Sequence, residues 1–466
     1  MTRLVMKFGG SLLASKGGIK RAADLAVERR RKGDDVVVVV SALGDVTDLL
    51  LESASEACGW TEREIDGAID GLRKIHLSCI EPTSLDGGAK KELGSGLEAS
   101  LVRLKETLLG ISILGELSPR SKDLVVSFGE RMSAPIVSAE IRGRGFGSPF
   151  LTGGEAGIVT DGTFGEASPD PAVTRRSVKG RLSPILARGE VPVVAGFIAR
   201  SRAGEITTLG RGGSDFTATL LGASIGADEV WIWTDVAGIL TADPRIVKSS
   251  VSVPRLSYAE AEELAFFGAK NMHPLALGPA RKAGLPVRIL SGFKPDLPGT
   301  LISKEQTKSR GVVKVVALVR SVGLLTVAGE TLQGRSGIAA KVFSSLAGSG
   351  VNILMISQSV SEANISMIVK RASLNRAVAA LKRDLRHIEV GVHGDPDVSV
   401  VAAVGAGMRG ERGVAARVFG AVASRGINIR MIAQGSSELN ISFVVDERDA
   451  EEAVRALHRR VVLLAR

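Results

Sequence analysis

Cysteines, aromatic residues and long hydrophobic runs are all scarce in this sequence, and each shortage excludes some classes of protein. Cys58 and Cys79 are the two cysteines among 466 residues, and neither lies in a CxxC pair or a Cys/His cluster. This usage argues against a structural zinc site and favours a reducing compartment. No apolar run approaches the ~20 residues of a membrane-spanning helix. Because a strand-like run begins within four residues of Met1, a secretory signal peptide has no room. We therefore expect a cytoplasmic protein.

Aromatic residues make up 4% of the chain, which is too few for an evident base-stacking platform. The formal net charge of +10 nevertheless suggests an anionic partner. The basic residues are scattered, and the densest run, at 28–33, falls at the end of an expected amphipathic helix, where cations complement the helix dipole. Anionic small molecules explain the charge as well as nucleic acid does. We expect neither a nucleic-acid partner nor a membrane partner.

The chain is too long for one ordinary core, so we expect two or three domains. Up to residue 300, strand-like and helix-like stretches alternate. Continuous apolar runs typical of strands buried on both faces lie at 36–42, 123–130, 191–199 and 229–235. Apolar residues at helical spacing lie at 19–33, 131–143 and 214–227, and a longer helical excursion covers 61–110. The alternation predicts the α/β class, with a mostly parallel sheet sandwiched by helices.

A repeat follows this α/β region. Stretches of 33 residues that begin at Gly337 and Gly413 are identical at 18 positions without a gap. Each copy predicts a small ferredoxin-like βαββαβ module. The second copy also contains a GxGxxG pattern at Gly405, Gly407 and Gly410, but the strand after it offers no acidic residue for a dinucleotide ribose.

Small, hydroxylic and glycine residues gather at the expected strand ends. Lys7 is followed by Gly9, Gly10 and Ser11, and the segment 207–218 holds a glycine loop that opens a helix. Exposed amides and the positive end of a helix dipole favour an anion, such as a phosphate. A simple turn is the alternative interpretation of the Gly-Gly pair. Neither segment fits the P-loop pattern.

Five short motifs follow one another along the chain. They are KFGGS at 7–11, SFGER at 127–131, TLGRGGSD at 208–215, TDVAGI at 234–239 and GAK at 268–270. In this order they resemble aspartokinases, members of the amino-acid kinase superfamily, and the repeats resemble the two ACT modules of that family. The resemblance implies the amino-acid kinase fold at 1–303 and ACT regulatory modules at 320–393 and 398–466. It also implies that a strand from 311–320 completes the second module.

The activity implied by the resemblance is ATP-dependent phosphorylation of the side-chain carboxylate of L-aspartate to 4-phospho-L-aspartate. This reaction begins the biosynthesis of lysine, threonine and methionine. The acceptor carboxylate is already ionised at neutral pH, so the site needs positioning and charge neutralisation rather than a general base. ATP is the implied co-substrate, and Mg²⁺ is expected to arrive with the nucleotide. We name no protein ligand for the metal.

Four residues are expected to carry the transfer. Lys7 would lie over the phosphoryl group, while the amides of Gly9 and Gly10 would hold its oxygens. The resemblance makes Asp215 the carboxylate that orients Lys7. The alternative for Asp215 is a role in capping a helix.

The charges of free aspartate predict its partners. Arg211 is expected to bind the α-carboxylate as a fork, and Glu130, placed just past a strand end, is expected to receive the ammonium group. Ser41, Thr47 and Ser214 are expected to hydrogen-bond the substrate. As alternatives, Ser41 and Thr47 serve as turn and helix-cap hydroxyls and Glu130 forms a surface salt bridge.

The resemblance also assigns residues to ATP. They are Lys7, Phe8, Gly10, Ser11, Thr234, Asp235, Leu240, Arg245 and Lys270. Arg245 and Lys270 are long cations able to reach phosphates. Leu240 stands where the family often has a tyrosine, so an aromatic contact near the nucleotide is expected to be missing.

In this family, ACT modules bind an end-product amino acid where the modules of two chains pair, so we expect a homodimer or a dimer of dimers. The implied effector residues are Asn352, Ile353, Gln358, Asn428, Ile429 and Gln434. Amide side chains beside apolar ones suit a small hydroxylated amino acid, and no carboxylate stands ready for a lysine ammonium group. Threonine is therefore our first expectation and lysine the second. Ordinary module packing is the alternative role for these residues.

Two other functions stay open. One is a kinase for another amino-acid carboxylate, such as glutamate or acetylglutamate, and the other is a catalytically silent amino-acid sensor. The SFGER and TLGRGGSD motifs together with the two repeats argue against the first, and the intact Lys7 and Asp215 argue against the second.

Overall fold

The structure is a computed structural model that describes residues 2–15, 17–267, 274–305, 312–329, 336–359 and 364–463. The chain folds into two compact units. The first comprises residues 1–239, 254–258 and 270–305, and the second comprises 240–253, 259–269 and 306–466. Within the described parts of the chain, none of the helices has the length and apolarity that a membrane crossing would require.

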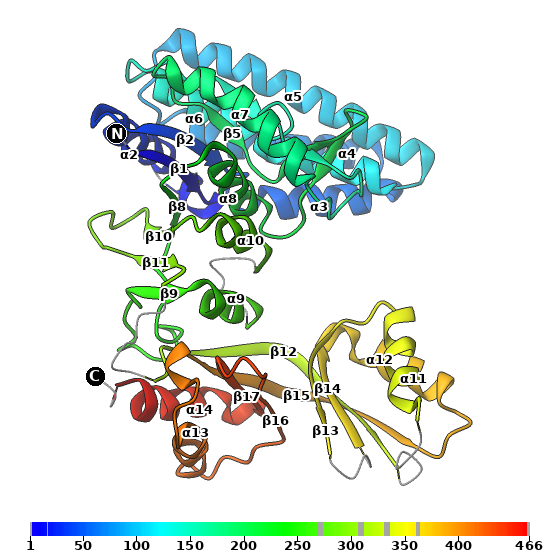
Figure 1. Cartoon of the computed structure of the whole chain (residues 1–466). Coiled ribbons are helices and arrows are strands. Elements are labelled where there is room, and N and C mark those ends of the chain that lie inside the picture. Colours follow the sequence, from blue (N-terminus) through cyan, green and yellow to red (C-terminus); the bar gives the residue numbers. More distant parts are fainter. Residues whose placement is uncertain are drawn as a thin grey trace. The chain divides into compact units, whose positions relative to one another are not determined.

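An eight-stranded sheet forms the centre of the first unit, in the order β3-β5-β2-β1-β8-β10-β11-β9 (Figure 1). Neighbouring strands run parallel except for β10 and β11. The strands are β1 Arg3–Phe8, β2 Asp35–Val40, β3 Phe150–Thr152, β5 Val193–Ala195, β8 Glu229–Thr234, β9 Arg255–Ser257, β10 Val287–Ser291 and β11 Thr300–Ser303. The predicted α/β class with a mostly parallel sheet is confirmed.

Burial on both faces explains the continuous apolar runs of the central strands. All six residues of β2 are buried, and the strands predicted at 36–42 and 229–235 correspond to β2 and β8. The run at 191–199 instead forms two short strands, because Phe197 has a positive φ of 64° between them. The second of these strands joins a three-stranded sheet of β4 Val159–Thr160, β6 Ile198–Ser201 and β7 Ile206–Thr208.

Helices pack around this sheet. They are α1 Gly10–Leu13, α2 Gly18–Arg31, α3 Val46–Glu56, η1 Ala57–Gly59, α4 Glu62–Ile80, α5 Gly87–Leu114, α6 Pro119–Arg142, α7 Pro171–Ala187, α8 Gly213–Ile225 and α10 Pro274–Ala283. The helices predicted at 19–33 and 214–227 correspond to α2 and α8. The predicted helical excursion is the pair α4 and α5, which begins at a capping box in which Thr61 and Glu64 bond each other's backbone.

The strand predicted at 123–130 is wrong, because these residues lie inside helix α6. Ser118 caps the helix by accepting a hydrogen bond from the Ser121 amide, and Pro119 occupies the first turn. Nearly every residue from Val125 to Ile141 is buried. A helix that is buried all round has a continuous apolar sequence like that of a buried strand, so periodicity could not separate the two.

The second unit contains a six-stranded antiparallel sheet in the order β13-β14-β12-β15-β17-β16 (Figure 1). Its strands are β12 Val315–Ala328, β13 Ile353–Gln358, β14 Asn364–Lys370, β15 Gly391–Val404, β16 Met431–Ala433 and β17 Asn440–Asp446. Its helices are α9 Tyr258–Phe266, α11 Ile338–Gly348, α12 Arg371–Asp384, η3 Ala406–Met408, α13 Val414–Ala423, η4 Glu447–Asp449, α14 Ala450–Leu457 and η5 His458–Leu463. Tyr258, the first residue of α9, belongs to the first unit.

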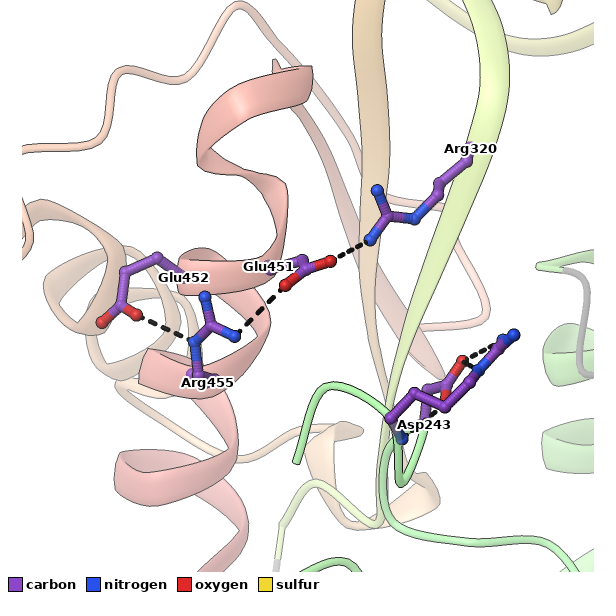
Figure 2. Close-up of polar contacts among 6 residues, drawn as sticks. Asp243, Arg320, Glu451, Glu452 and Arg455 are labelled. Carbon is purple, nitrogen blue, oxygen red and sulfur yellow. Dashed lines mark hydrogen bonds and ion pairs between the residues drawn. The ribbon is translucent and has the colours of Figure 1, made fainter. Parts of the chain in front are cut away.

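The long strands β12 and β15 are shared by the two repeats. The first half of β12 pairs Val315–Val319 with Val400–Val404, and its second half pairs Val322–Ala328 with β14. The register shifts between the halves, next to Ser321, which has a φ of 57°. A chain of ion pairs from Arg320 through Glu451 to Arg455 then links β12 to α14 (Figure 2).

Candidate active site

The centre of the candidate site is an ion pair between Lys7 and Asp215. Lys7 lies near the carboxyl end of β1, between β2 and β8, and its Nζ is 2.6 Å from Asp215 Oδ1. The two side chains are 12% and 11% exposed. Asp215 belongs to the first turn of α8, where a negative charge complements the helix dipole. It therefore pairs with Lys7 and is not the cap of α8, whose N-cap residue is Gly212.

The two glycines after β1 have different roles. The Gly9 amide donates a hydrogen bond to the Trp233 carbonyl at 3.1 Å, so it is not free to hold a phosphoryl oxygen, contrary to the prediction. At Gly10, a Cβ would lie 2.4 Å from the Ala42 carbonyl oxygen, so only glycine fits. The amides of Gly10 and Ser11 begin α1, where a helix offers them no internal acceptor.

Glu130 lies in the middle of α6 rather than past a strand end, and it is not a surface salt bridge. The residue is 2% exposed, and its Oε1 accepts a hydrogen bond from the Ala42 amide at 3.1 Å. Within the described parts of the chain, Oε2 is buried without a hydrogen-bond donor. Burial raises the pKa of Glu130 to about 8, although the nearby Lys7 charge acts in the opposite direction. A cationic ligand would compensate this buried carboxylate.

Sequence reasoning missed Asp123, which lies about two turns before Glu130 on the same helix. Its Oδ2 accepts hydrogen bonds from the amides of Thr208 and Gly165, at 2.9 and 3.0 Å, and its Oδ1 accepts one from the Thr208 hydroxyl at 2.8 Å. Asp123 is buried, and burial raises its pKa while these hydrogen bonds lower it. The carboxylate thus ties α6 to the end of β7, where the glycine loop begins. An acidic residue at the start of an apolar run was the sequence signal that could have identified Asp123.

The other predicted substrate residues lie around this centre. The Ser133 hydroxyl donates to the Ser41 carbonyl at 2.8 Å and so joins the turn after β2 to α6. Thr47 is half-buried in the first turn of α3. Ser214 is buried against Gly196, and a Cβ added at Gly196 would lie 2.8 Å from the Cβ of Ser214. Arg211 is exposed, and no residue in the described ranges pairs with its side chain.

Three of the predicted nucleotide residues lie at the same edge of the sheet. The Phe8 ring is fully buried and stacks on Trp233, with centroids 6.2 Å apart, so its side chain belongs to the core. Thr234 ends β8, and its hydroxyl donates to Asp235 Oδ1 at 3.0 Å. Asp235 is exposed.

Leu240 and Arg245 belong to the second unit, and Lys270 lies outside the described residues. Leu240 is half-buried and forms a bridge with Ser252. The Arg245 guanidinium binds the Asp243 carboxylate through Nε at 3.0 Å and Nη2 at 2.6 Å (Figure 2). Exposed pairs of this kind contribute little free energy, so a phosphate could replace Asp243 as the partner.

The predicted effector residues lie in or next to the two edge strands of the second unit's sheet, β13 and β16. Asn352 precedes β13, while Ile353 and Gln358 are its first and last residues. In the second repeat, Asn428 and Ile429 precede β16 and Gln434 follows it. The amide side chains of both sets are exposed.

Family models match almost the whole chain. A model described as the amino acid kinase family matches residues 2–291, and one described as the ACT domain matches residues 325–385 and 401–461. The fold and these matches define an amino acid kinase with two appended ACT domains. The domain limits predicted at residues 303, 320, 393 and 398 do not coincide with the ends of these matches, and they stay predictions.

Similar proteins indicate which kind of amino acid kinase this chain is. Aspartokinase 2, chloroplastic, of Arabidopsis thaliana is 34% identical over 97% of this chain and 83% of its own length. Two crystal structures of E. coli aspartokinase III, each 31% identical, cover 98% of this chain and 99% of their own. The complex with aspartate and ADP has a TM-score of 0.82, and the complex with lysine and aspartate has one of 0.81. The chain therefore belongs to the aspartokinases and is an aspartate kinase with ATP as co-substrate.

Proposed function

We propose that Lys7 and Asp215 act as a unit on the phosphoryl group that passes from ATP to the aspartate side chain. Lys7 neutralises charge on the transferring group, and Asp215 holds the ammonium group in place. The buried 2.6 Å ion pair at the carboxyl end of a central parallel strand supports this assignment. Ligands of open α/β sheets bind beyond these strand ends.

Glu130 and Arg211 would then recognise the two charges of the amino-acid backbone. The free Oε2 of Glu130 is suited to the aspartate ammonium group, because a cation compensates the buried carboxylate. Arg211, which is unpaired within the described ranges, can bind the α-carboxylate with two parallel hydrogen bonds. Ser41, Thr47 and Ser214 are proposed to complete the substrate contacts.

For ATP, we assign the phosphates to the Gly10 and Ser11 amides together with Arg245 and Lys270. Thr234 and Asp235 are proposed to contact the rest of the nucleotide, and Phe8 to contribute its backbone only. Leu240 provides an aliphatic surface in place of an aromatic one. Mg²⁺ is proposed to arrive with the nucleotide and to bridge its phosphates.

The ACT modules are proposed to bind an amino-acid end product at the β13 and β16 edges, where a second copy would also pair. Threonine is the effector expected first from the sequence, whereas E. coli aspartokinase III has been crystallised with lysine and aspartate. No observation ranks threonine above lysine. Both amino acids therefore enter the test.

The test is ATP-dependent acyl-phosphate formation, trapped as the hydroxamate, on aspartate, glutamate and acetylglutamate. We expect turnover on aspartate alone and a reduction by threonine or lysine. Turnover that neither amino acid reduces would contradict the effector proposal and leave the kinase. Turnover on acetylglutamate, whose amino group is blocked, without turnover on aspartate would contradict the ammonium-binding role of Glu130.

A further inference from the structure

A cleft of about 830 Å³ lies beside helix α6. Its lining includes all three residues of β3 and Ala195, the last residue of β5. The walls come from α5, α6, β6 and β7. None of the proposed substrate residues lines it. Arg131 in the cleft directly follows Glu130 on α6. Glu130 itself does not line the cleft, and its Oε1 accepts a hydrogen bond from the Ala42 amide.

Most of the cleft surface is apolar, which suits an organic ligand. The larger apolar side chains in its walls are Leu93, Leu97, Met132, Phe150, Ile198 and Ile206. Phe150 lies on the edge strand β3, and half of the residue is exposed. The volume falls within the range of sites that enclose small molecules of metabolite size.

Three arginines, Arg131, Arg142 and Arg200, are among the polar residues that line this cleft. Arg131 lies with its guanidinium carbon 4.4 Å from the centroid of the Phe128 ring. Arg142 makes two long hydrogen bonds, of 3.4 and 3.5 Å, to Ser138 and Ser148. Among the described residues, nothing forms an ion pair or hydrogen bond with the side chains of Arg131 or Arg200. Both are half-buried.

In this respect Arg131 and Arg200 differ from several other arginines of the first unit. Arg73, Arg144, Arg188 and Arg288 each bind a carboxylate. Burial and the neighbouring Arg103 lower the pKa of the Arg131 guanidinium, whereas Glu155 raises it. A counter-anion would relieve this destabilisation of the charged form.

The carboxylates of the cleft do not fill this need. Two acidic residues, Glu92 and Glu155, line it together with the three arginines, which leaves an excess of positive charge. Glu155 Oε2 already accepts hydrogen bonds from the Thr152 amide and hydroxyl, at 2.7 and 2.9 Å. Glu92 is exposed at the rim.

We propose that this cleft is a second small-molecule site, which binds an organic anion with an apolar body and a carboxylate, sulfonate or phosphate head. The head lies between Arg131 and Arg200, and the body packs against Phe150 and the apolar walls. Arginine is suited to this role because its planar fork binds such heads with two hydrogen bonds.

The test is a fluorescence titration of the full-length chain with anilinonaphthalene sulfonate, which joins a fused aromatic body to a sulfonate. We expect one saturable site, with affinity reduced about tenfold in both Arg131→Gln and Arg200→Gln, because each loses a charge-assisted hydrogen bond. Arg202→Gln is the matched control, since Arg202 lies just after β6, the strand that carries Arg200, but binds Asp170 outside the cleft. We expect its affinity to equal that of the wild type.

Unchanged affinity in Arg200→Gln would overturn the proposal, and this variant decides alone if circular dichroism shows that Arg131→Gln does not fold. Competition supplies the second readout. Phenylbutyrate is expected to displace the dye, and the neutral phenylbutyramide is not; equal displacement by both would overturn the anion requirement. Aspartate turnover of Arg200→Gln should match the wild type, so a failure of this proposal is distinguishable from a failure of the kinase site.

Discussion

Lys7 and Asp215 are about 200 positions apart in the sequence, yet Lys7 Nζ lies 2.6 Å from Asp215 Oδ1. Strand β1 presents the lysine and the first turn of α8 presents the aspartate. Both groups are largely removed from water, so each depends on the other for compensation of its charge. This arrangement leads to the first prediction.

Asp215→Asn is expected to lower kcat on aspartate by about a hundredfold or more, because breaking a buried ion pair leaves Lys7 uncompensated and free to leave its position. KM for ATP should change much less. Steady-state kinetics checks this prediction. Asp66→Asn is the control, since Asp66 forms an exposed pair with Lys105. An Asp215→Asn variant with the kcat of this control would refute the role.

Glu130 is expected to make stability fall as pH rises. Burial raises its pKa from 4.5 to about 8, so between these values the folded chain holds a proton that the unfolded chain releases. By linkage, this contribution to the free energy of unfolding is complete below pH 4.5 and is lost as pH rises through 8. Glu130→Gln cannot titrate. Urea unfolding over this range should show a wild-type-minus-variant difference that declines with pH, and a flat difference would be inconsistent with the buried carboxyl.

The two glycines of KFGGS are expected to differ in their tolerance of alanine. Gly10→Ala would place a Cβ 2.4 Å from a backbone carbonyl oxygen, so we expect a loss of about 1–3 kcal/mol in the free energy of unfolding and a loss of activity. Gly9→Ala meets its nearest atom at 3.5 Å, and its φ of −75° suits alanine. Thermal melts and kcat of the two variants test this contrast. A Gly9→Ala variant that is the more damaged of the two would contradict it.

Asp123 is expected to be a positioning residue. Asp123→Asn turns one of its accepting oxygens into a donor that faces other donors, which costs about 1–3 kcal/mol. Because this carboxylate ties α6 to the end of β7, the variant should raise KM for aspartate while kcat changes little. Asp161→Asn, in an exposed turn, is the matched control. A variant with a lower melting temperature and an unchanged KM would show that Asp123 acts on stability alone.

The sequence predicted those features that depend on local pattern. The valine run of β2, the amphipathic α2 and the capped excursion of α4 and α5 follow from periodicity and end signals. The motifs that carry Lys7 and Asp215 could be found without the structure, and the resemblance implied that Asp215 orients Lys7. Local pattern alone could not predict this contact, because it depends on the packing of α8 against β1.

Misread features depend on tertiary packing. Helix α6 is buried on all sides, so its apolar run looked like a strand and Glu130 and Asp123 were given the wrong setting. The Gly9 amide was expected to face a phosphate, whereas the pairing of β1 with β8 places the Trp233 carbonyl against it. The arginine cleft beside α6 is lined by residues from four segments of the chain, so no local sequence pattern could predict it.

The most direct test of the account is a single-turnover measurement of phosphoryl transfer from ATP to aspartate in the wild type, Lys7→Met and Lys32→Met. Lys32 is an exposed control that pairs with Glu28. We predict that Lys7→Met slows transfer by about a thousandfold, in line with the loss of one charge-stabilising group, while Lys32→Met matches the wild type. Transfer by Lys7→Met at the wild-type rate would contradict the central claim.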